Sequence, residues 1–307
     1  MSQIPDRATN QAQVKAVRDM LTAMMTSADS EPTMEARRAG YDAWGMAFPL
    51  PEGSTCDDTT LGGVAAEKIV VKDADAKTAL LYLHGGGYGI GSAKSHRHLA
   101  GQLCAASGLV GYNVDYRLAP EAVFPAAVDD ALASYRALLN SGISSDHIVI
   151  AGDSAGGGLT LACALAIKGA ELPQPAGLFA ISPWANLTQT GASYGVKAEA
   201  DFICTKPALD DWARHYVAGA DPKNPLASPI FGDLSGLAPL LIHVGSEEVL
   251  LSDSIALAHA AGLAQVDVSL FIAPDMPHVF HYMWAQIGAA GVAISEAGAW
   301  MKARVNA

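Results

Sequence analysis

The sequence predicts an α/β fold, in which a mostly parallel central sheet is flanked by helices and carries a helical cap. From about residue 64 onward, strand patterns alternate with helix patterns, an order typical of parallel sheets with crossover helices. The strand patterns at 79–83, 147–151 and 239–244 are apolar almost throughout, as strands buried on both faces are. Half of the 307 residues are hydrophobic and 16% are charged, so the chain can bury a large core.

The N-terminal part has a different pattern. Residues 11–28 and 33–47 repeat apolar side chains at helical spacing, and Val14, Val17 and Leu21 form one stripe in the first of them. The turn-rich segment 48–63 ends this part of the chain. We therefore expect cap helices within residues 1–50.

The elements of the main domain follow in order. The residues 124–142 show the clearest helical period, with apolar side chains three and four positions apart. The predicted strands are 66–73, 78–87, 108–117, 147–152, 176–182, 238–245 and 266–274, and the predicted helices are 95–107, 124–142, one beginning at Ala155, 252–262 and 282–305.

One segment, 185–230, interrupts this alternation. It is rich in glycine, proline and aromatic residues, which fits an inserted cap. We expect the main domain to comprise residues 51–184 and 231–307, with 185–230 completing the cap.

Composition excludes several classes of function. The net charge is −12, from 19 Lys and Arg against 31 Asp and Glu, so neither nucleic acid nor an anionic membrane surface is an expected partner. No run of about 18 apolar residues predicts a membrane span, and the first 20 residues have no apolar signal core. The four cysteines lack metal-site spacing, so we expect no metal or cofactor, reduced thiols and a cytoplasmic location.

The stretch "HIVIAGDSAGGGL" places Ser154 between Gly152 and Gly156, at the turn from a predicted strand to a predicted helix. A serine in a Gly-x-Ser-x-Gly turn of this kind is exposed above the sheet as a nucleophile, and side chains at the glycine positions would clash with backbone. A glycine-rich turn of this kind can also bind phosphate, but the Lys-Ser/Thr of a phosphate loop is absent here. We therefore predict that Ser154 is a nucleophile.

A second glycine motif supports this prediction. The strand pattern at 80–83 ends in His84-Gly85-Gly86-Gly87, where backbone amides can point at a developing oxyanion. A flexible turn is the alternative, but the serine turn in the same chain favours an oxyanion hole.

The base is expected late in the chain, because triads on such strand–turn–helix scaffolds follow the order serine, acid, histidine. Of the nine histidines, His278 and His281 follow the last predicted strand. His278 lies in the loop directly behind that strand, whereas His281 falls near the start of the last predicted helix. We therefore favour His278 as the base.

The acid is expected after the strand at 238–245. Glu247, Glu248 and Asp253 all follow it. Asp253 precedes a helical run, so N-capping is its simplest role. Spacing alone does not distinguish Glu247 from Glu248, because a loop has no fixed period.

Together these motifs resemble the bacterial hormone-sensitive-lipase family of α/β-hydrolase esterases. The resemblance covers about residues 65 to 305 and is specific as a set. Its motifs are "HGGG" (84–87), "DYRLAPE" (115–121), "FPAAVDD" (124–130), "GDSAGG" (152–157), "SPWANLT" (182–188) and "PHVF" (277–280).

The resemblance implies the α/β-hydrolase fold, Ser154 as nucleophile and His278 as base. It also implies an oxyanion hole formed by the amides of Gly86, Gly87 and Ala155. Most members carry an aspartate in a D-P-L-x-D stretch, whereas this chain has E-V-L-L-S at 248–252, so Glu248 takes the place of the acid. The motif around His278 also departs from the usual family pattern, because Val279 stands where most members have glycine.

The expected reaction is hydrolysis of a small-molecule ester of short to medium acyl length, or of a lactone, through an acyl-enzyme. An amidase or lactonase with the same triad, and a non-catalytic ligand receptor on this fold, are the alternatives; the presence of His278 argues against the receptor. Dimerisation is common in the family, and the sequence is silent on a homodimer here. The candidate pocket residues are aromatic: Tyr88, Tyr194, Phe202, Trp212 and Tyr216.

Overall fold

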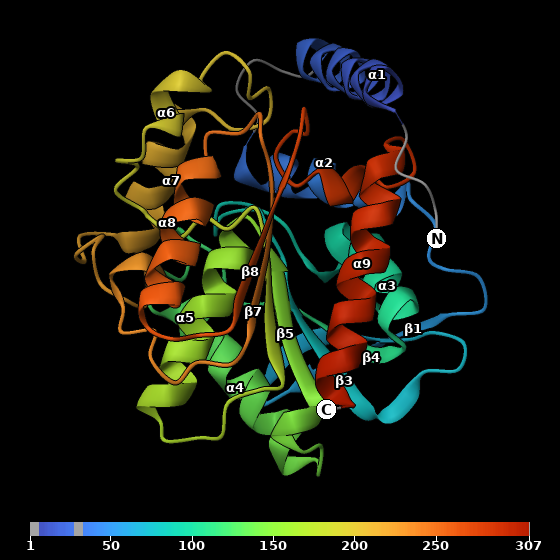
Figure 1. The fold of residues 1–307 in the computed structure, drawn as a ribbon, viewed down its shortest axis with the longest axis vertical. Coiled ribbons are helices and arrows are strands. Elements are labelled where there is room, and N and C mark those ends of the chain that lie inside the picture. Colours follow the sequence, from blue (N-terminus) through green and yellow to red (C-terminus); the bar gives the residue numbers. More distant parts are fainter. Residues whose placement is uncertain (1–5, 28–32, 307) are drawn as a thin grey trace.

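A computed structural model describes residues 6–27 and 33–306 and places an eight-stranded sheet at its centre (Figure 1). The strand order is β1-β2-β4-β3-β5-β6-β7-β8. β1, β2 and β4 pair antiparallel, and all pairings from β4 through β3 to β8 are parallel, which confirms the predicted α/β-hydrolase fold class. The strands are β1 (Thr55–Leu61), β2 (Val64–Val70), β3 (Asp75–Leu83), β4 (Leu109–Val114), β5 (Ile148–Asp153), β6 (Gly177–Ile181), β7 (Leu240–Gly245) and β8 (Val268–Ala273).

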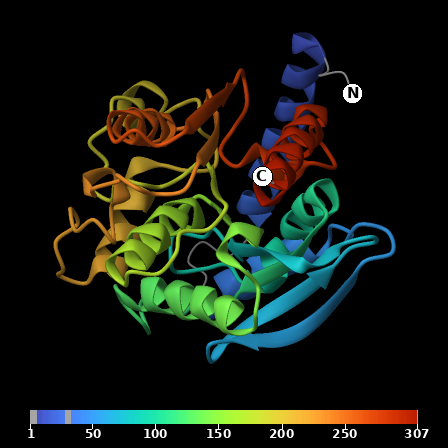
Figure 2. The ribbon, with the colours of Figure 1, turned by 60° about the horizontal axis from the view of Figure 1, so that its bottom comes forward.

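Helices cover both faces of the sheet (Figure 2). Successive residues of β3 point to opposite faces, as the period of a strand requires. Leu80 and Tyr82 pack in the core with α3 and α9, whereas Leu81 and Leu83 pack with α4, α5 and α8. The helices of these two layers are α3 (Ala93–Ser107), α9 (Gly288–Val305), α4 (Ala126–Asn140), α5 (Ala155–Gly169) and α8 (Leu251–Leu263).

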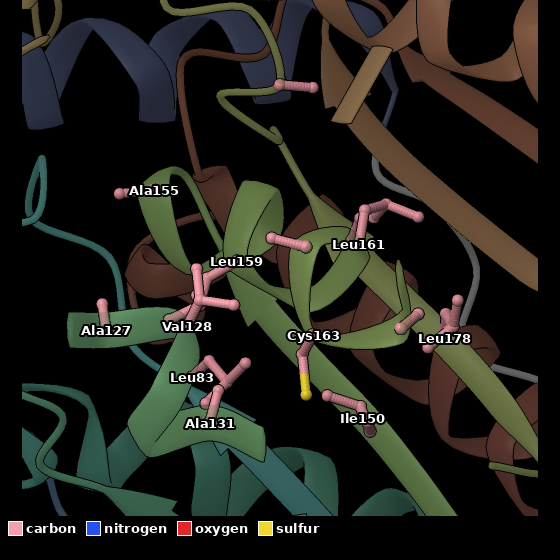
Figure 3. Packing of buried hydrophobic residues seen from close by; sticks show 14 of the residues in the cluster. Leu83, Ala127, Val128, Ala131, Ile150, Ala155, Leu159, Leu161, Cys163 and Leu178 are labelled. Atoms are coloured by element: carbon pink, nitrogen blue, oxygen red, sulfur yellow. The ribbon is translucent and has the colours of Figure 1, made fainter. Parts of the chain in front are cut away.

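The larger of the hydrophobic core clusters fills the space between the central strands and the helices α4 and α5. Small side chains on α5 and β5 allow this helix to approach the sheet closely, and Leu83 and Ile150 fill the space between them and α4 (Figure 3). The side chains here are fully buried, so the strand–helix junction that carries Ser154 rests on a close-packed layer.

Further helices lie outside these two layers. Figure 1 shows α1 (Arg7–Ser27) and α2 (Met34–Met46) at the upper end of the molecule, with α6 (Ser193–Val196) and α7 (Lys206–Val217) on its left side. The expected division into cap and main domain stays a prediction, and its residues 1–5 and 28–32 lie outside the described part of the chain. Among the helices that the structure describes, none is long and apolar enough to cross a membrane.

Two sequence-based expectations were wrong. The segment 48–63, predicted as turns, contains β1, which is mostly exposed and therefore lacks apolar alternation; its ladder with β2 begins at Thr55↔Val70 and holds it in place. The two strands are joined at Gly62 and Gly63, both with positive φ, as a tight hairpin turn requires.

The helix predicted for 282–305 begins only at Gly288. A short 3₁₀ turn, η3 (Phe280–Met283), precedes it, and its buried apolar side chains continue the pattern without a visible break. Apolar spacing alone therefore could not locate the start of α9.

Candidate active site

Ser154 occupies a strained turn between β5 and α5. Its backbone has φ 54° and ψ −120°, a conformation that L-residues rarely adopt. A Cβ on Gly152 would lie 2.3 Å from the carbonyl oxygen of Gly156, and one on Gly156 would lie 2.0 Å from that of Leu83. Both glycines are therefore required by close backbone approach, which explains the pattern seen in the sequence.

His278 connects this turn to Glu248. Nε2 of His278 lies 3.0 Å from Oγ of Ser154, and Nδ1 lies 2.7 Å from Oε2 of Glu248. Because a carboxylate only accepts, Nδ1 carries a proton, and Nε2 of the neutral imidazole can accept the serine proton. The arrangement can thus transfer a proton from Ser154 to the ring while Glu248 fixes the tautomer.

Glu248 is fully buried at the turn after β7. Its second oxygen, Oε1, accepts the hydroxyl of Ser182 at 2.8 Å and the backbone N–H of Gly245 at 2.5 Å. Ser182 Oγ also accepts the N–H of Val279, the residue after His278, at 3.1 Å. One serine thus holds both Glu248 and the histidine loop, and its presence in "SPWANLT" was the only signal for it in the sequence.

The other two carboxylates do not contact His278. Glu247 pairs with Lys197, whose Nζ lies 3.1 Å from Oε2. Asp253 is not the N-cap of α8, because it lies inside the first turn and accepts the backbone N–H groups of Ala185 and Asn186 at 3.1 and 2.9 Å. Burial raises the pKa of Asp253 to about 8, although these donors lower it.

The electrostatics around the two late histidines differ. Burial lowers the pKa of His278, but Cys204 and the Glu248 carboxylate raise it, and the net pKa lies well above 6.5. His281 lies in η3, not in α9, and its Nε2 is 3.1 Å from Nδ1 of His243. Burial lowers the pKa of His281 well below 6.5, so it is a neutral core residue.

The glycine loop after β3 is fixed by its carbonyl groups. Nδ1 of His84 donates to the carbonyl oxygen of Gly85 at 2.8 Å, and the N–H of Ile90 donates to that of Gly86 at 2.9 Å. The N–H and C=O of a trans peptide point in opposite directions, so these bonds turn the amides of Gly86 and Gly87 away from the loop interior. The N–H of Ala155, the first residue of α5, is not used within the helix.

A buried carboxylate joins this loop to the serine turn. Asp153 Oδ1 accepts the Tyr82 hydroxyl at 2.6 Å and the N–H of Gly85 at 3.1 Å, and its Oδ2 lies 3.3 Å from Nε2 of His96. Burial raises the pKa of Asp153, whereas His96 and Tyr82 lower it, and the net shift is downward. Asp153 therefore remains charged and locks the glycine loop beside Ser154.

A cavity of about 220 Å³ opens above Ser154 and His278. One wall comes from α2 and η3, and the other comes from α7 and the segment before it. The lining residues are Tyr41, Trp44, Gly86, Gly87, Ile90, Asp153, Ser154, Ile203, Cys204, Leu209, Trp212, His278, Val279, Tyr282 and Met283.

Of the five predicted pocket aromatics, Trp212 lines this cavity. Its ring covers the glycine loop, since a Cβ on Gly89 would lie 2.2 Å from it. The rings of Tyr88 and Tyr216 stack on each other within the core, with 3.7 Å between their centroids.

The other two predicted aromatics also lie elsewhere. The Tyr194 hydroxyl donates to Asp253 at 3.1 Å, and Phe202 lies 4.8 Å below the Arg18 guanidinium. The lining of this cavity therefore includes Trp212 and not the other four aromatic residues, because aromatic content alone does not show which rings pack in the core.

No pattern in the sequence singles out Tyr41, Trp44 or Tyr282, which also line the cavity. Trp44 and Tyr282 lie 4.6 Å apart between ring centroids, and they come from segments more than 200 positions apart.

Among the described residues, no group of three or more His, Cys, Asp or Glu could hold a metal ion.

Comparisons with known proteins identify the family to which this fold belongs. A family model described as alpha/beta hydrolase fold matches residues 80–282. An acetyl-hydrolase of Streptomyces hygroscopicus is 44% identical over 272 residues, which cover 88% of this chain and 90% of the relative. A solved structure described as a hormone-sensitive lipase from a metagenome library has a TM-score of 0.91 and 46% identity, covering 95% of this chain and 98% of its own. EstE5, soaked with p-nitrophenyl butyrate, has a TM-score of 0.90 and 40% identity, covering 96% and 99%.

Proposed function

The chain belongs to the hormone-sensitive-lipase family of α/β-hydrolase-fold esterases, and we propose that it hydrolyses short-chain esters with Ser154, His278 and Glu248 as its triad. Its activity class is carboxylic ester hydrolysis, as in the relatives named acetyl-hydrolase and esterase. The observation that carries the proposal is the continuous hydrogen-bond chain from Ser154 through His278 to Glu248 at the floor of a cavity.

The first half of the reaction forms an acyl-enzyme. His278 Nε2 accepts the proton of Ser154 Oγ as this oxygen attacks the ester carbonyl carbon. The carbonyl oxygen becomes an oxyanion and receives hydrogen bonds from the amides of Gly86, Gly87 and Ala155. One such donor is worth about 3 kcal/mol in related serine enzymes. His278 then gives the proton to the alkoxide oxygen as the C–O bond breaks, and the alcohol leaves.

The second half releases the acid. Water gives a proton to His278 Nε2 and its oxygen attacks the acyl carbon, and the same amides stabilise the second oxyanion. Collapse returns the proton from His278 to Ser154 Oγ and frees the carboxylic acid. Glu248 remains ionised throughout and stabilises the imidazolium that forms in both halves.

The cavity favours small acyl groups. Its volume of about 220 Å³ lies below the range of about 300–1,000 Å³ usual for drug-sized ligands. Trp212 lines it above the glycine loop, and Tyr41, Trp44 and Tyr282 line another part of its wall. Two relatives point the same way, one named acetyl-hydrolase and one soaked with a butyrate ester.

Hydrolysis of p-nitrophenyl esters with acyl chains from C2 to C12 tests the proposal. The wild type is expected to prefer the shortest chains, and Ser154→Ala is expected to lose turnover and labelling by a fluorophosphonate. Ser141→Ala is the matched control, because Ser141 is the exposed C-cap residue of α4 and its hydroxyl donates to the Leu138 carbonyl at 2.7 Å.

Three outcomes would contradict parts of the proposal. Full activity of Ser154→Ala would exclude this nucleophile. A folded wild type that cleaves p-nitroanilides or lactones but no ester would move the activity to the amidase or lactonase alternatives. A wild type that neither turns over substrate nor reacts with the probe would favour a ligand receptor.

A further inference from the structure

A buried carboxylate in the segment between α6 and α7 joins two parts of the active site. Asp201 is 4% exposed. Its Oδ1 accepts the N–H groups of Ile203 at 2.9 Å and Cys204 at 2.8 Å, and its Oδ2 accepts the N–H of Val249 at 2.9 Å. One side chain therefore holds two amides of its own segment and one amide of the turn after β7.

Both ends of this bridge bear on the site. Ile203 and Cys204 line the cavity opposite Tyr41 and Trp44, and we call them the cap wall. Val249 directly follows Glu248 within residues 246–250, which we call the acid turn. Asp201 is thus the side chain through which the cap wall is bonded to the acid turn.

The bridge is strong by its chemistry. A carboxylate taken out of water needs its lone pairs filled, and three amide donors do this with charge-assisted bonds, which are about twice as strong as neutral ones. The cap wall has no strand or long helix of its own at this point, because α7 begins only at Lys206. Its position therefore depends on the Asp201 carboxylate.

We propose that Asp201 is a positioning residue that fixes the cap wall against the acid turn and thereby determines which acyl lengths the cavity accepts. This inference rests on ester hydrolysis at Ser154. Asp201 itself is not in the cavity lining, so it acts through the backbone of Ile203 and Cys204.

A neighbouring serine supplies a matched control. Ser193 Oγ donates to the carbonyl oxygen of Val249 and accepts the N–H of Ser252 at 2.9 Å. It therefore joins the α6 segment to the acid turn as Asp201 does, but it makes no bond to the cap wall. Ser193→Ala weakens the same junction and leaves the Asp201 bridge in place.

Asp201→Asn changes the bridge with the least loss of volume. An amide has one acceptor oxygen, so it can serve the Ile203 and Cys204 amides or the Val249 amide, while its NH₂ group faces a donor on the other side. Asp201→Ala removes both sides and serves as the second variant. Thermal unfolding of all three variants shows how much each loses in stability.

The experiment compares kcat and KM for p-nitrophenyl acetate and p-nitrophenyl hexanoate. We expect Asp201→Asn to raise KM for the acetate and to change the acetate-to-hexanoate ratio of kcat/KM by about tenfold, the scale on which pocket shape discriminates chain length. Ser193→Ala should keep the wild-type ratio even where it lowers the melting temperature. Asp201→Ala should change the ratio at least as much as Asp201→Asn.

Several results would overturn the inference. An unchanged ratio in Asp201→Asn, or an equal loss of kcat on both esters at constant KM, would reduce Asp201 to a role in folding or in holding Glu248. A ratio shift of the same size in Ser193→Ala would remove the special role of the bridge. If Asp201→Asn folds and Asp201→Ala does not, the acetate-to-hexanoate ratio of kcat/KM in Asp201→Asn alone decides the inference. A wild type inactive on both esters overturns the proposed function as well, whereas an active one with an unchanged variant ratio overturns this inference alone.

Discussion

Ser182 Oγ donates to Oε1 of Glu248 over 2.8 Å, so a serine at the end of β6 holds the carboxylate that contacts His278. The same hydroxyl oxygen accepts the N–H of Val279. Hydrogen bonds on the far side of a functional side chain help to fix its orientation toward its partner. Ser182 is therefore expected to influence the rate without contacting the substrate.

The first prediction concerns Ser182→Ala. Loss of the Ser182 hydroxyl leaves Oε1 of the buried Glu248 carboxylate with one donor instead of two, and it frees the Val279 N–H in the loop that carries His278. We therefore expect kcat/KM for a short ester to fall about tenfold, mainly through kcat. Steady-state kinetics on p-nitrophenyl acetate measure this. Ser246→Ala is the control, because Ser246 Oγ accepts the N–H of Asp275, in the loop before His278, and donates to Glu247, so it links the same two loops without bonding to Glu248. Equal effects of both variants would contradict a specific role for Ser182.

The second prediction concerns pH. His278 must be neutral to accept a proton, and its pKa lies well above 6.5, so kcat/KM of the wild type should rise with pH through an apparent pKa above 6.5. In Glu248→Gln burial still lowers the pKa of His278 and Cys204 still raises it, but the contribution of the Glu248 charge is gone, so the rise should move to lower pH. The plateau should also fall by about 10³–10⁴-fold.

Rate profiles between pH 5 and 9 decide this, with Glu247→Gln as the matched carboxylate control. Glu247 contacts Lys197 on the outer side of the turn, so its profile should keep the wild-type position. A Glu248→Gln profile at the same pH as that of the wild type, or a large rate loss in Glu247→Gln, would contradict the assignment of Glu248 as the acid.

The sequence was sufficient for the fold class and for placing Ser154 and His278 in the hydrogen-bond chain, because these depend on local features. The glycines around Ser154 and the glycine run after β3 exist to relieve specific backbone contacts, and such contacts leave a fixed pattern in the sequence. The choice among Glu247, Glu248 and Asp253 needed the three-dimensional structure or the family resemblance, because the direction in which each side chain leaves a turn is not periodic.

Other parts of the site could not be predicted from the sequence. The cavity combines Trp44 of α2 with Tyr282 of η3 and Trp212 of α7, which only the tertiary fold brings together. Tyr88 and Tyr216 were predicted for the pocket, but their large apolar rings stack in the core. The edge strand β1 left no pattern because its ladder with β2, and not burial, holds it.

The third prediction tests the close approach of α5 to β3. In Gly156→Ala the new methyl group would lie 2.0 Å from the Leu83 carbonyl oxygen and 2.5 Å from that of His84, and neither backbone can easily move. Overpacking of this kind costs about 1–3 kcal/mol, so the melting temperature should fall and the serine turn should lose activity. Gly169→Ala in the same helix has nothing within 4 Å of the new Cβ and should be neutral or stabilising. A Gly156→Ala variant as stable and active as the wild type would contradict this packing.

The fourth prediction identifies what limits acyl length. The Trp212 ring covers the glycine loop and lines the cavity from α7, so Trp212→Ala should widen the cavity between the glycine loop and α7. Longer p-nitrophenyl esters, such as the octanoate, should gain on the acetate by about tenfold in relative kcat/KM, since each methylene that finds apolar wall adds to transition-state binding. Tyr216→Leu is the control, because Tyr216 lies on the same helix but stacks on Tyr88 away from the cavity. If the acyl-length profile of Trp212→Ala remains that of the wild type, Trp212 bounds the alcohol side of the cavity, and a series of acetate esters with different alcohols should then show the gain instead.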